Sequence, residues 1–129
     1  MSPRRKEEVV RKIVVGVDGS PNAAAAMRWA LDEARRRSCE VEALLAWHEP
    51  IDATGYGYIG VDITDVEAGS RAQLDGLVDA ARAIAPDVEV KGILSHGHPS
   101  QCLIEAAQDA DLVVVGRRGH NAALRLVLG

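Results

Sequence analysis

An unbroken aliphatic run, Leu112 to Val115, places the strongest constraint on the fold of this chain. A strand with one face in water alternates apolar and polar residues, whereas a strand covered on both faces is apolar at each position. The run has no such alternation, so we expect it to form a strand in a parallel sheet with helices on both faces. Gly116 follows it, where the chain must leave the sheet.

Three further apolar segments alternate with three amphipathic ones along the rest of the chain. The expected strands are 12–17, 41–47, 88–94 and 112–115, and the expected helices are 22–37, 65–85 and 98–109. Ser20 and Pro21 mark the start of the first helix, because serine caps a helix N-terminus and proline fits its first position. This alternation predicts an α/β fold, a doubly wound parallel sheet with right-handed crossovers. With the first and fourth strands as neighbours, the strand order is 3-2-1-4, and the third strand lies at an edge.

Length and charge limit the domain organisation and the class of ligand. The chain has 129 residues, which suits one domain, so we expect a flexible leader at 1–11 and a single domain over 12–129. Its net charge of -4 provides no field that attracts nucleic acid. No apolar segment has the length of a membrane span or the position of a secretion signal, so we expect a cytoplasmic protein without nucleic-acid or membrane partners. Cys39 and Cys102 lack metal-ligand spacing and are expected to be buried thiols.

Two glycine-containing turns follow the first and the fourth strands, where a doubly wound sheet binds its ligands. The first is Asp18-Gly19-Ser20, and the second runs from Gly116 to Gly119 and contains two arginines. Glycine lets the backbone approach a ligand closely, so the second turn can present amide groups to phosphate. A carboxylate beside phosphates needs a ribose hydroxyl, an adenine amino group or Mg²⁺ to face, which favours a nucleotide over simple phosphate. The alternatives are that Asp18 bonds its own backbone and that the arginines point into water.

These residues, together with the end of the second strand, resemble the universal stress protein family. The resemblance rests on Gly16-Val17-Asp18-Gly19-Ser20, on Ala46-Trp47, and on Val115-Gly116 followed by Gly119 and Gly129 at spacings of two and nine residues. It covers the chain from about Lys12 to the last residue. The resemblance implies an adenine nucleotide alpha-hydrolase-like fold, and an ATP-binding protein, usually a homodimer, that acts in stress adaptation.

On the family pattern, the residues around the two turns divide between the parts of a nucleotide. Val17 and Asp18 would contact the adenine and ribose, Ala46 would reach the adenine through its backbone, and Val115 would pack beside the base. The glycines of the second turn would line the path of the ribose and phosphates. The implied cofactor is ATP, alone or with Mg²⁺. The candidate binding residues are Gly16, Val17, Asp18, Ala46, Val115, Gly116, Arg117, Arg118, Gly119 and Gly129.

The chain departs from the family pattern after Gly129. The family continues there with Ser or Thr, a helix and a fifth strand, and none of these follows in this sequence. We therefore expect a C-terminally truncated domain in which the fourth strand is an exposed apolar edge, prone to association. We also expect weaker phosphate contacts, because a helix N-terminus at that place would bind phosphate.

Two other functions stay open beside nucleotide binding without turnover. A weak ATP hydrolase of the same fold is one, although no base, nucleophile or acid pair is evident in the sequence. A dimeric signalling protein that binds no nucleotide is the other, and the incomplete phosphate half of the site favours it. A metal cluster of His48, His96 and His98 is less favoured, because no carboxylate or cysteine accompanies them at ligand spacing.

Overall fold

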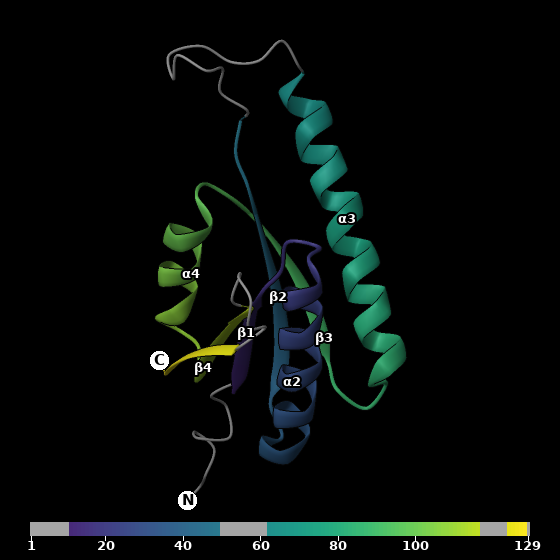
Figure 1. The fold of residues 1–129 in the computed structure, drawn as a ribbon, viewed down its shortest axis with the longest axis vertical. Helices are drawn as coiled ribbons and strands as arrows, with labels where there is room; N and C mark the ends of the chain where they lie inside the picture. The colour runs from purple at the N-terminus through teal and green to yellow at the C-terminus, as the bar shows by residue number, and fades with distance from the viewer. Residues whose placement is uncertain (1–10, 50–61, 117–123, 129) are drawn as a thin grey trace, which may run out of the picture.

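The computed structural model describes residues 11–49, 62–116 and 124–128. Within these ranges the chain forms one sheet and three helices (Figure 1). The elements are β1 (Lys12–Gly16), α2 (Pro21–Arg37), β2 (Glu40–Trp47), α3 (Ile63–Ile84), β3 (Val90–His96), α4 (Pro99–Ala107), β4 (Leu112–Gly116) and β5 (Leu124–Leu128). The predicted alternation of strands and helices is confirmed from β1 to β4.

The sheet has the order β3-β2-β1-β4-β5. Strands β1 to β4 are parallel, which confirms the predicted order 3-2-1-4 and the edge position of β3. Gly16, at the end of β1, pairs with Leu44 of β2 and with Val115 of β4. The strand order therefore reverses between the carboxyl ends of β1 and β4, which is where such a sheet opens a crevice.

β5 corrects the expectation that β4 is an exposed edge with no fifth strand beside it. It runs antiparallel to β4, from Leu124 opposite Gly116 to Leu128 opposite Leu112. The glycine spacing favours a loop from Gly116 to Gly129, but an apolar edge strand has backbone amides and carbonyls that need partners. Because the chain folds back beside β4, the fifth position of the sheet is filled from within the segment predicted as a loop.

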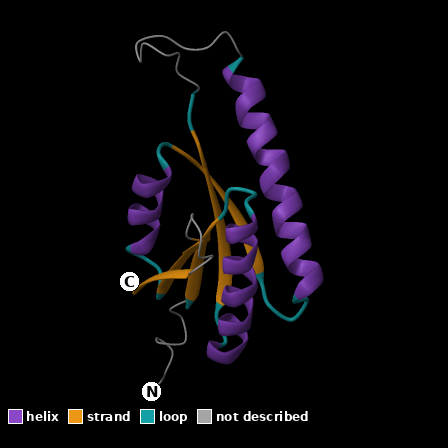
Figure 2. Cartoon of the chain, viewed as in Figure 1, coloured by secondary structure: helices purple, strands orange, loops and turns teal. Residues whose placement is uncertain are grey.

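The two faces of the sheet are covered by different helices (Figure 2). Ile13 and Val15 of β1 belong to the core under α2 and α3, whereas Val14 packs with Cys102 of α4, and all three β1 residues are fully buried. Ile13, Val14 and Val15 are all apolar because β1 is buried on both faces. Cys39 and Cys102 are free and buried, as predicted, and burial raises the pKa of each thiol.

Local sequence sets the helix starts. Pro21 is the first residue of α2, and the Ser20 hydroxyl oxygen accepts a hydrogen bond of 3.1 Å from the Ala23 amide, which confirms the predicted cap. The carboxylate of Asp62 caps α3 in the same way, at 2.8 Å from the Thr64 amide. Among the helices that the structure describes, none combines the length and the apolar character that a membrane span requires.

Strand pairing, by contrast, sets the ends of β3, which lies two residues later than the predicted 88–94. Val88 closes a turn instead, since its amide donates to the Ala85 carbonyl over 3.1 Å. At the other end, β3 continues because β2 runs beside it as far as Trp47. The local sequence does not show these neighbours.

Charged side chains occupy the outer edge of β3. The guanidinium of Arg82 donates to the Val90 carbonyl through Nε at 3.1 Å and Nη2 at 2.7 Å. Lys91 lies on the same strand, with its Nζ 3.4 Å from the Glu40 carboxylate of β2. A carbonyl that already accepts two side-chain hydrogen bonds is a poor acceptor for another strand, so pairing is hindered at this end of β3.

Candidate functional site

A cavity of about 340 Å³ lies at the carboxyl ends of β1, β2 and β4, beside the start of α4. Its volume is within the range of roughly 300–1,000 Å³ that small-molecule sites occupy. Every predicted binding residue that the structure describes lines it, namely Gly16, Val17, Asp18, Ala46, Val115 and Gly116. Arg117, Arg118, Gly119 and Gly129 lie outside the described residues.

The sequence did not indicate half of the lining. Pro99 and Leu103 of α4 close one side of the cavity, although α4 belongs to neither of the two turns. The signal available for them was the proline start of a helix directly after β3, at the same edge of the sheet as the turns. The other unpredicted lining residues are Ser20, Ala23, Leu44 and Leu45.

The turn after β1 is held by its own side chains. The Asp18 carboxylate accepts a 2.9 Å hydrogen bond from the Ser20 amide, and Gly19 has a φ of +82°. The Ser20 hydroxyl in turn accepts from the Ala23 amide. The alternative that Asp18 bonds its own backbone is therefore confirmed, and the exposed Asp18 carboxylate also lines the cavity. Two amides near the start of α2 are already bonded, so this helix end is a poor phosphate site.

Gly116 is glycine for a reason of packing. A Cβ built on it would lie 2.4 Å from the Asn22 carbonyl oxygen and 2.8 Å from the Ala23 nitrogen. The end of β4 thus rests on the first turn of α2. A Cβ on Gly16 would meet only side chains, Val115 at 3.2 Å and Leu103 at 3.3 Å. Gly116 thus lets β4 approach α2, and Gly16 leaves space beside Val115 and Leu103, two residues that line the cavity.

The chemistry of the described lining is simple. Val115, Leu103, Pro99 and Ala46 present apolar surface, and Asp18 is the one ionisable residue among the described lining residues. A flat apolar ring can bury itself against such walls. A hydroxyl group on the same ligand can donate to the carboxylate, in a hydrogen bond strengthened by its charge.

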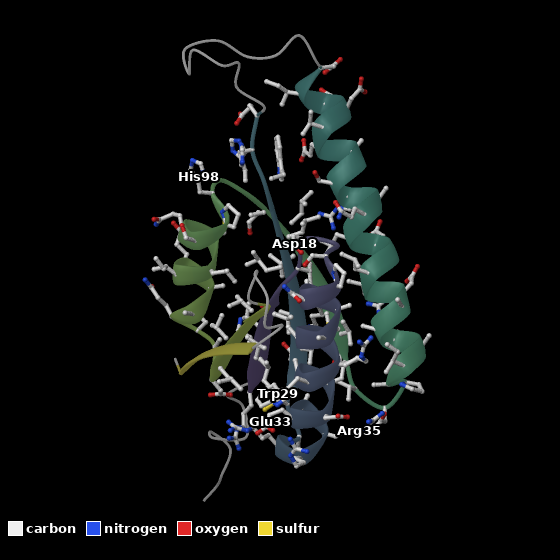
Figure 3. The ribbon with its side chains drawn as sticks, viewed as in Figure 1. Asp18, Trp29, Glu33, Arg35 and His98 are labelled. Atoms are coloured by element: carbon white, nitrogen blue, oxygen red, sulfur yellow. The ribbon has the colours of Figure 1, made fainter. Side chains whose placement is uncertain are left out.

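Four ionisable side chains gather near the ends of β2 and β3 and the start of α4, namely His48, Glu49, His96 and His98. The His96 ring packs on Trp47 with centroids 4.5 Å apart, and its Nε2 lies 2.9 Å from both carboxylate oxygens of Glu49. This hydrogen bond to His96 is the main cause that lowers the pKa of Glu49. The rings of His48 and His98 face each other at 5.1 Å; Figure 3 shows His98 at the start of α4 and Asp18 after β1. In the part of the chain that the structure describes, no three His, Cys, Asp or Glu residues are arranged to hold a metal ion.

A family model described as the universal stress protein family matches residues 10–129. The chain belongs to this family. A universal stress protein of Mycobacterium tuberculosis is 33% identical over 129 residues, which cover 98% of this chain and 41% of the relative. One of Mycolicibacterium smegmatis is 34% identical over 117 residues, which cover 91% of this chain and 39% of the relative. This universal stress protein chain therefore spans less than half the length of these curated relatives.

Solved structures of universal stress proteins share the fold. One from Burkholderia pseudomallei has a TM-score of 0.67 at 22% identity, over 85% of this chain and 83% of its own. One in complex with cAMP has a TM-score of 0.63 at 25% identity, over 84% and 77%. One from Archaeoglobus fulgidus in complex with dAMP has a TM-score of 0.60 at 26% identity, over 84% and 82%. The expected adenine nucleotide alpha-hydrolase-like fold is confirmed.

Proposed function

We propose that this universal stress protein binds an adenine nucleotide in the cavity at the ends of β1, β2 and β4, and acts as a regulatory module in stress adaptation. The observation that carries the proposal is the convergence of all six described candidate residues on one cavity. Two of the similar universal stress proteins are complexes with cAMP and with dAMP. Both ligands contain the adenine ring, although the sugar is ribose in cAMP and deoxyribose in dAMP.

The described lining fits the nucleoside part of such a ligand. The adenine ring would lie against the apolar walls made by Val115, Ala46 and the first turns of α4. The Asp18 carboxylate would accept a hydrogen bond from a ribose hydroxyl, as a carboxylate accepts several hydrogen bonds at once. Asp18 brings a negative charge, so the phosphates would lie away from it, toward the segment after β4.

We extend the proposal to ATP, alone or with Mg²⁺, as the nucleotide. Arg117, Arg118 and Gly119 would meet the phosphates. Where Mg²⁺ accompanies ATP, it would offset the repulsion between the phosphates and the Asp18 carboxylate, which is an oxygen ligand of the kind that Mg²⁺ takes. Binding without turnover fits the described lining better than hydrolysis, because Asp18, its one ionisable group, already accepts a hydrogen bond from the Ser20 amide. A cytoplasmic homodimer completes the proposal on the family resemblance, and light scattering after size exclusion measures the dimer.

Calorimetric titration of AMP, cAMP and ATP, the last with and without Mg²⁺, tests the proposal. Asp18→Asn keeps an oxygen for the Ser20 amide but removes the charge, so we expect about tenfold weaker binding, as for loss of a charge-assisted hydrogen bond. Ala46→Phe fills the cavity and should abolish binding. Asp79→Asn, an exposed change on α3, is the matched control.

Each outcome of this titration decides something. Affinity that is equal in Ala46→Phe and the unchanged chain would place the nucleotide elsewhere. No heat with any nucleotide would leave the non-nucleotide signalling protein as the better hypothesis. Phosphate released by the unchanged chain and not by Asp18→Asn would favour the weak hydrolase.

A further inference from the structure

A side chain of helix α3 contacts the turn that carries Asp18. The side-chain amide of Gln73 donates a hydrogen bond from Nε2 to the Asp18 carbonyl over 3.4 Å, across 55 residues of sequence. Among the described residues that line the cavity, none belongs to α3. Gln73 is thus a residue outside the cavity that is bonded to a residue of its lining.

Helix α3 is firmly packed on the sheet at the level of Gln73. The next residue, Leu74, is fully buried in the core. It packs so closely on Gly92 of β3 that a Cβ built there would lie 3.1 Å from Cγ of Leu74. Close packing of this kind leaves little room for the backbone to shift. The side chain of Gln73 therefore reaches the turn from a fixed position on α3.

Gly19 makes the contact possible and leaves the turn in need of it. A Cβ on Gly19 would lie 2.6 Å from Nε2 of Gln73, so a larger residue would displace the amide. The φ of Gly19 is +82°, and glycine takes positive and negative φ with similar ease. Steric limits alone therefore do not fix the orientation of the peptide that joins Asp18 to Gly19. The hydrogen bond from Gln73 favours the observed orientation, in which the Asp18 carbonyl is directed to α3.

The orientation of this peptide is coupled to the carboxylate of Asp18. The Ser20 amide donates to that carboxylate over 2.9 Å. This bond closes a ring of atoms that runs from the Asp18 side chain through the Asp18–Gly19 peptide to the Ser20 nitrogen. Any change in the peptide alters the shape of the ring, and with it the direction in which the carboxylate faces the cavity.

We propose that Gln73 is a positioning residue of the nucleotide site, which holds the Asp18 carboxylate in the direction that accepts a ribose hydroxyl. This inference rests on the proposed nucleotide site. Gln73 acts through Asp18, and Asp18 would contact the sugar and neither the base nor the phosphate. The contribution of Gln73 should therefore be present with a nucleotide that carries ribose hydroxyls and absent with one that lacks them.

The test is calorimetric titration of AMP and of 2′,3′-dideoxy-AMP into the unchanged chain, Gln73→Met and Gln73→Glu. Methionine keeps the length of the side chain and removes the donor. Glutamate keeps the shape and replaces the donor by a charged acceptor, which repels the Asp18 carbonyl. Both residues suit an exposed helix position, so the fold should be kept.

The quantity to compare is the ratio of the affinities for AMP and dideoxy-AMP, because the charge added in Gln73→Glu acts on the phosphate of both. This ratio should fall about threefold in Gln73→Met, the low end for one hydrogen bond, since 3.4 Å is long. It should fall about tenfold in Gln73→Glu, where repulsion adds to the lost bond. The matched control is Gln101→Met, which removes an exposed amide that bonds Glu105 of the same helix at 3.3 Å and should keep the ratio.

Equal losses for the two nucleotides would show that Gln73 only supports the fold around the site, and would overturn the positioning role, as would a ratio that no variant changes. A ratio of one in the unchanged chain would overturn the contact between Asp18 and the ribose, and this inference with it.

A second measurement separates the two proposals if no nucleotide binds, which would be a failure of the nucleotide site itself. Amide hydrogen exchange at Ser20 reports the bond to the Asp18 carboxylate directly. Exchange there should be faster in Gln73→Met than in the unchanged chain and in Gln101→Met. Equal exchange in the three proteins overturns the positioning role whether or not AMP binds.

Discussion

The contact between Gly116 and α2 leads to a quantitative prediction about stability. In Gly116→Ala the new Cβ would lie 2.4 Å from the Asn22 carbonyl oxygen, well inside the 3.0 Å that real Cβ atoms keep. The clashing atoms are backbone of a helix that packs on the sheet, so relief requires a shift of β4 or of α2. Overpacking of this kind costs about 1–3 kcal/mol, and we expect the upper half of that range because no flexible side chain can yield.

Urea unfolding with linear extrapolation measures this cost. Gly76→Ala is the matched control, because its Cβ has nothing within 4 Å and it lies inside helix α3. We expect that variant to be more stable by about 0.5–1 kcal/mol, the ordinary gain of alanine over glycine in a helix. Gly16→Ala should fall between the two, since its Cβ meets movable side chains at 3.2 Å and 3.3 Å. A Gly116→Ala protein within about 0.5 kcal/mol of the unchanged chain would refute the packing argument.

Two further predictions concern the core and the surface. Leu74 is 0% exposed between α3 and the sheet, so Leu74→Ala should lower the free energy of unfolding in urea by about 2–5 kcal/mol. Ile104 is 60% exposed, so Ile104→Ala should change it by under about 0.5 kcal/mol. Similar costs for the two variants would contradict the assigned burial. The bidentate hydrogen bonds from Arg35, at 2.8 and 2.9 Å, lower the pKa of Asp87. A carboxylate whose pKa is lower in the folded state than in the unfolded state stabilises the fold at pH values above its unfolded-state pKa, and this contribution is lost as pH falls through its folded-state pKa. Asp87→Asn should therefore reduce the loss of stability in acid. An identical dependence of stability on pH in the variant would show that the pair contributes nothing.

The parts of the fold that the sequence predicts are those set by short-range periodicity. The unbroken apolar run of β4 predicted a sheet covered on both faces. Ser20 and Pro21 predicted the cap and the first position of α2, although the expected range began at residue 22. β5 was missed because the glycine spacing around it resembles a ligand-binding loop. Its strand character comes from pairing with β4, a partner that the local sequence does not reveal.

The candidate site divides in the same way. The turns at Asp18 and Gly116 could be recognised because glycine and aspartate have few reasons to follow a buried strand. The α4 wall and the contact of His48 with His98 depend on how α4 packs across the sheet, over a separation of some fifty residues. Gly116 shows what the sequence pattern alone does not reveal. The pattern suggested that this glycine lets the backbone approach a ligand, and the structure shows that the first turn of α2 also occupies the space that a Cβ would need.

The capped edge of β3 has a consequence for how copies of this chain can assemble. Arg82 takes the Val90 carbonyl at one end of the sheet order, while β5 lies at the other end. Growth of a sheet from molecule to molecule needs two receptive edges, since each copy must accept one neighbour and offer itself to the next. Because Arg82 already occupies one outward acceptor of β3, pairing of copies into an open fibre is disfavoured by this route.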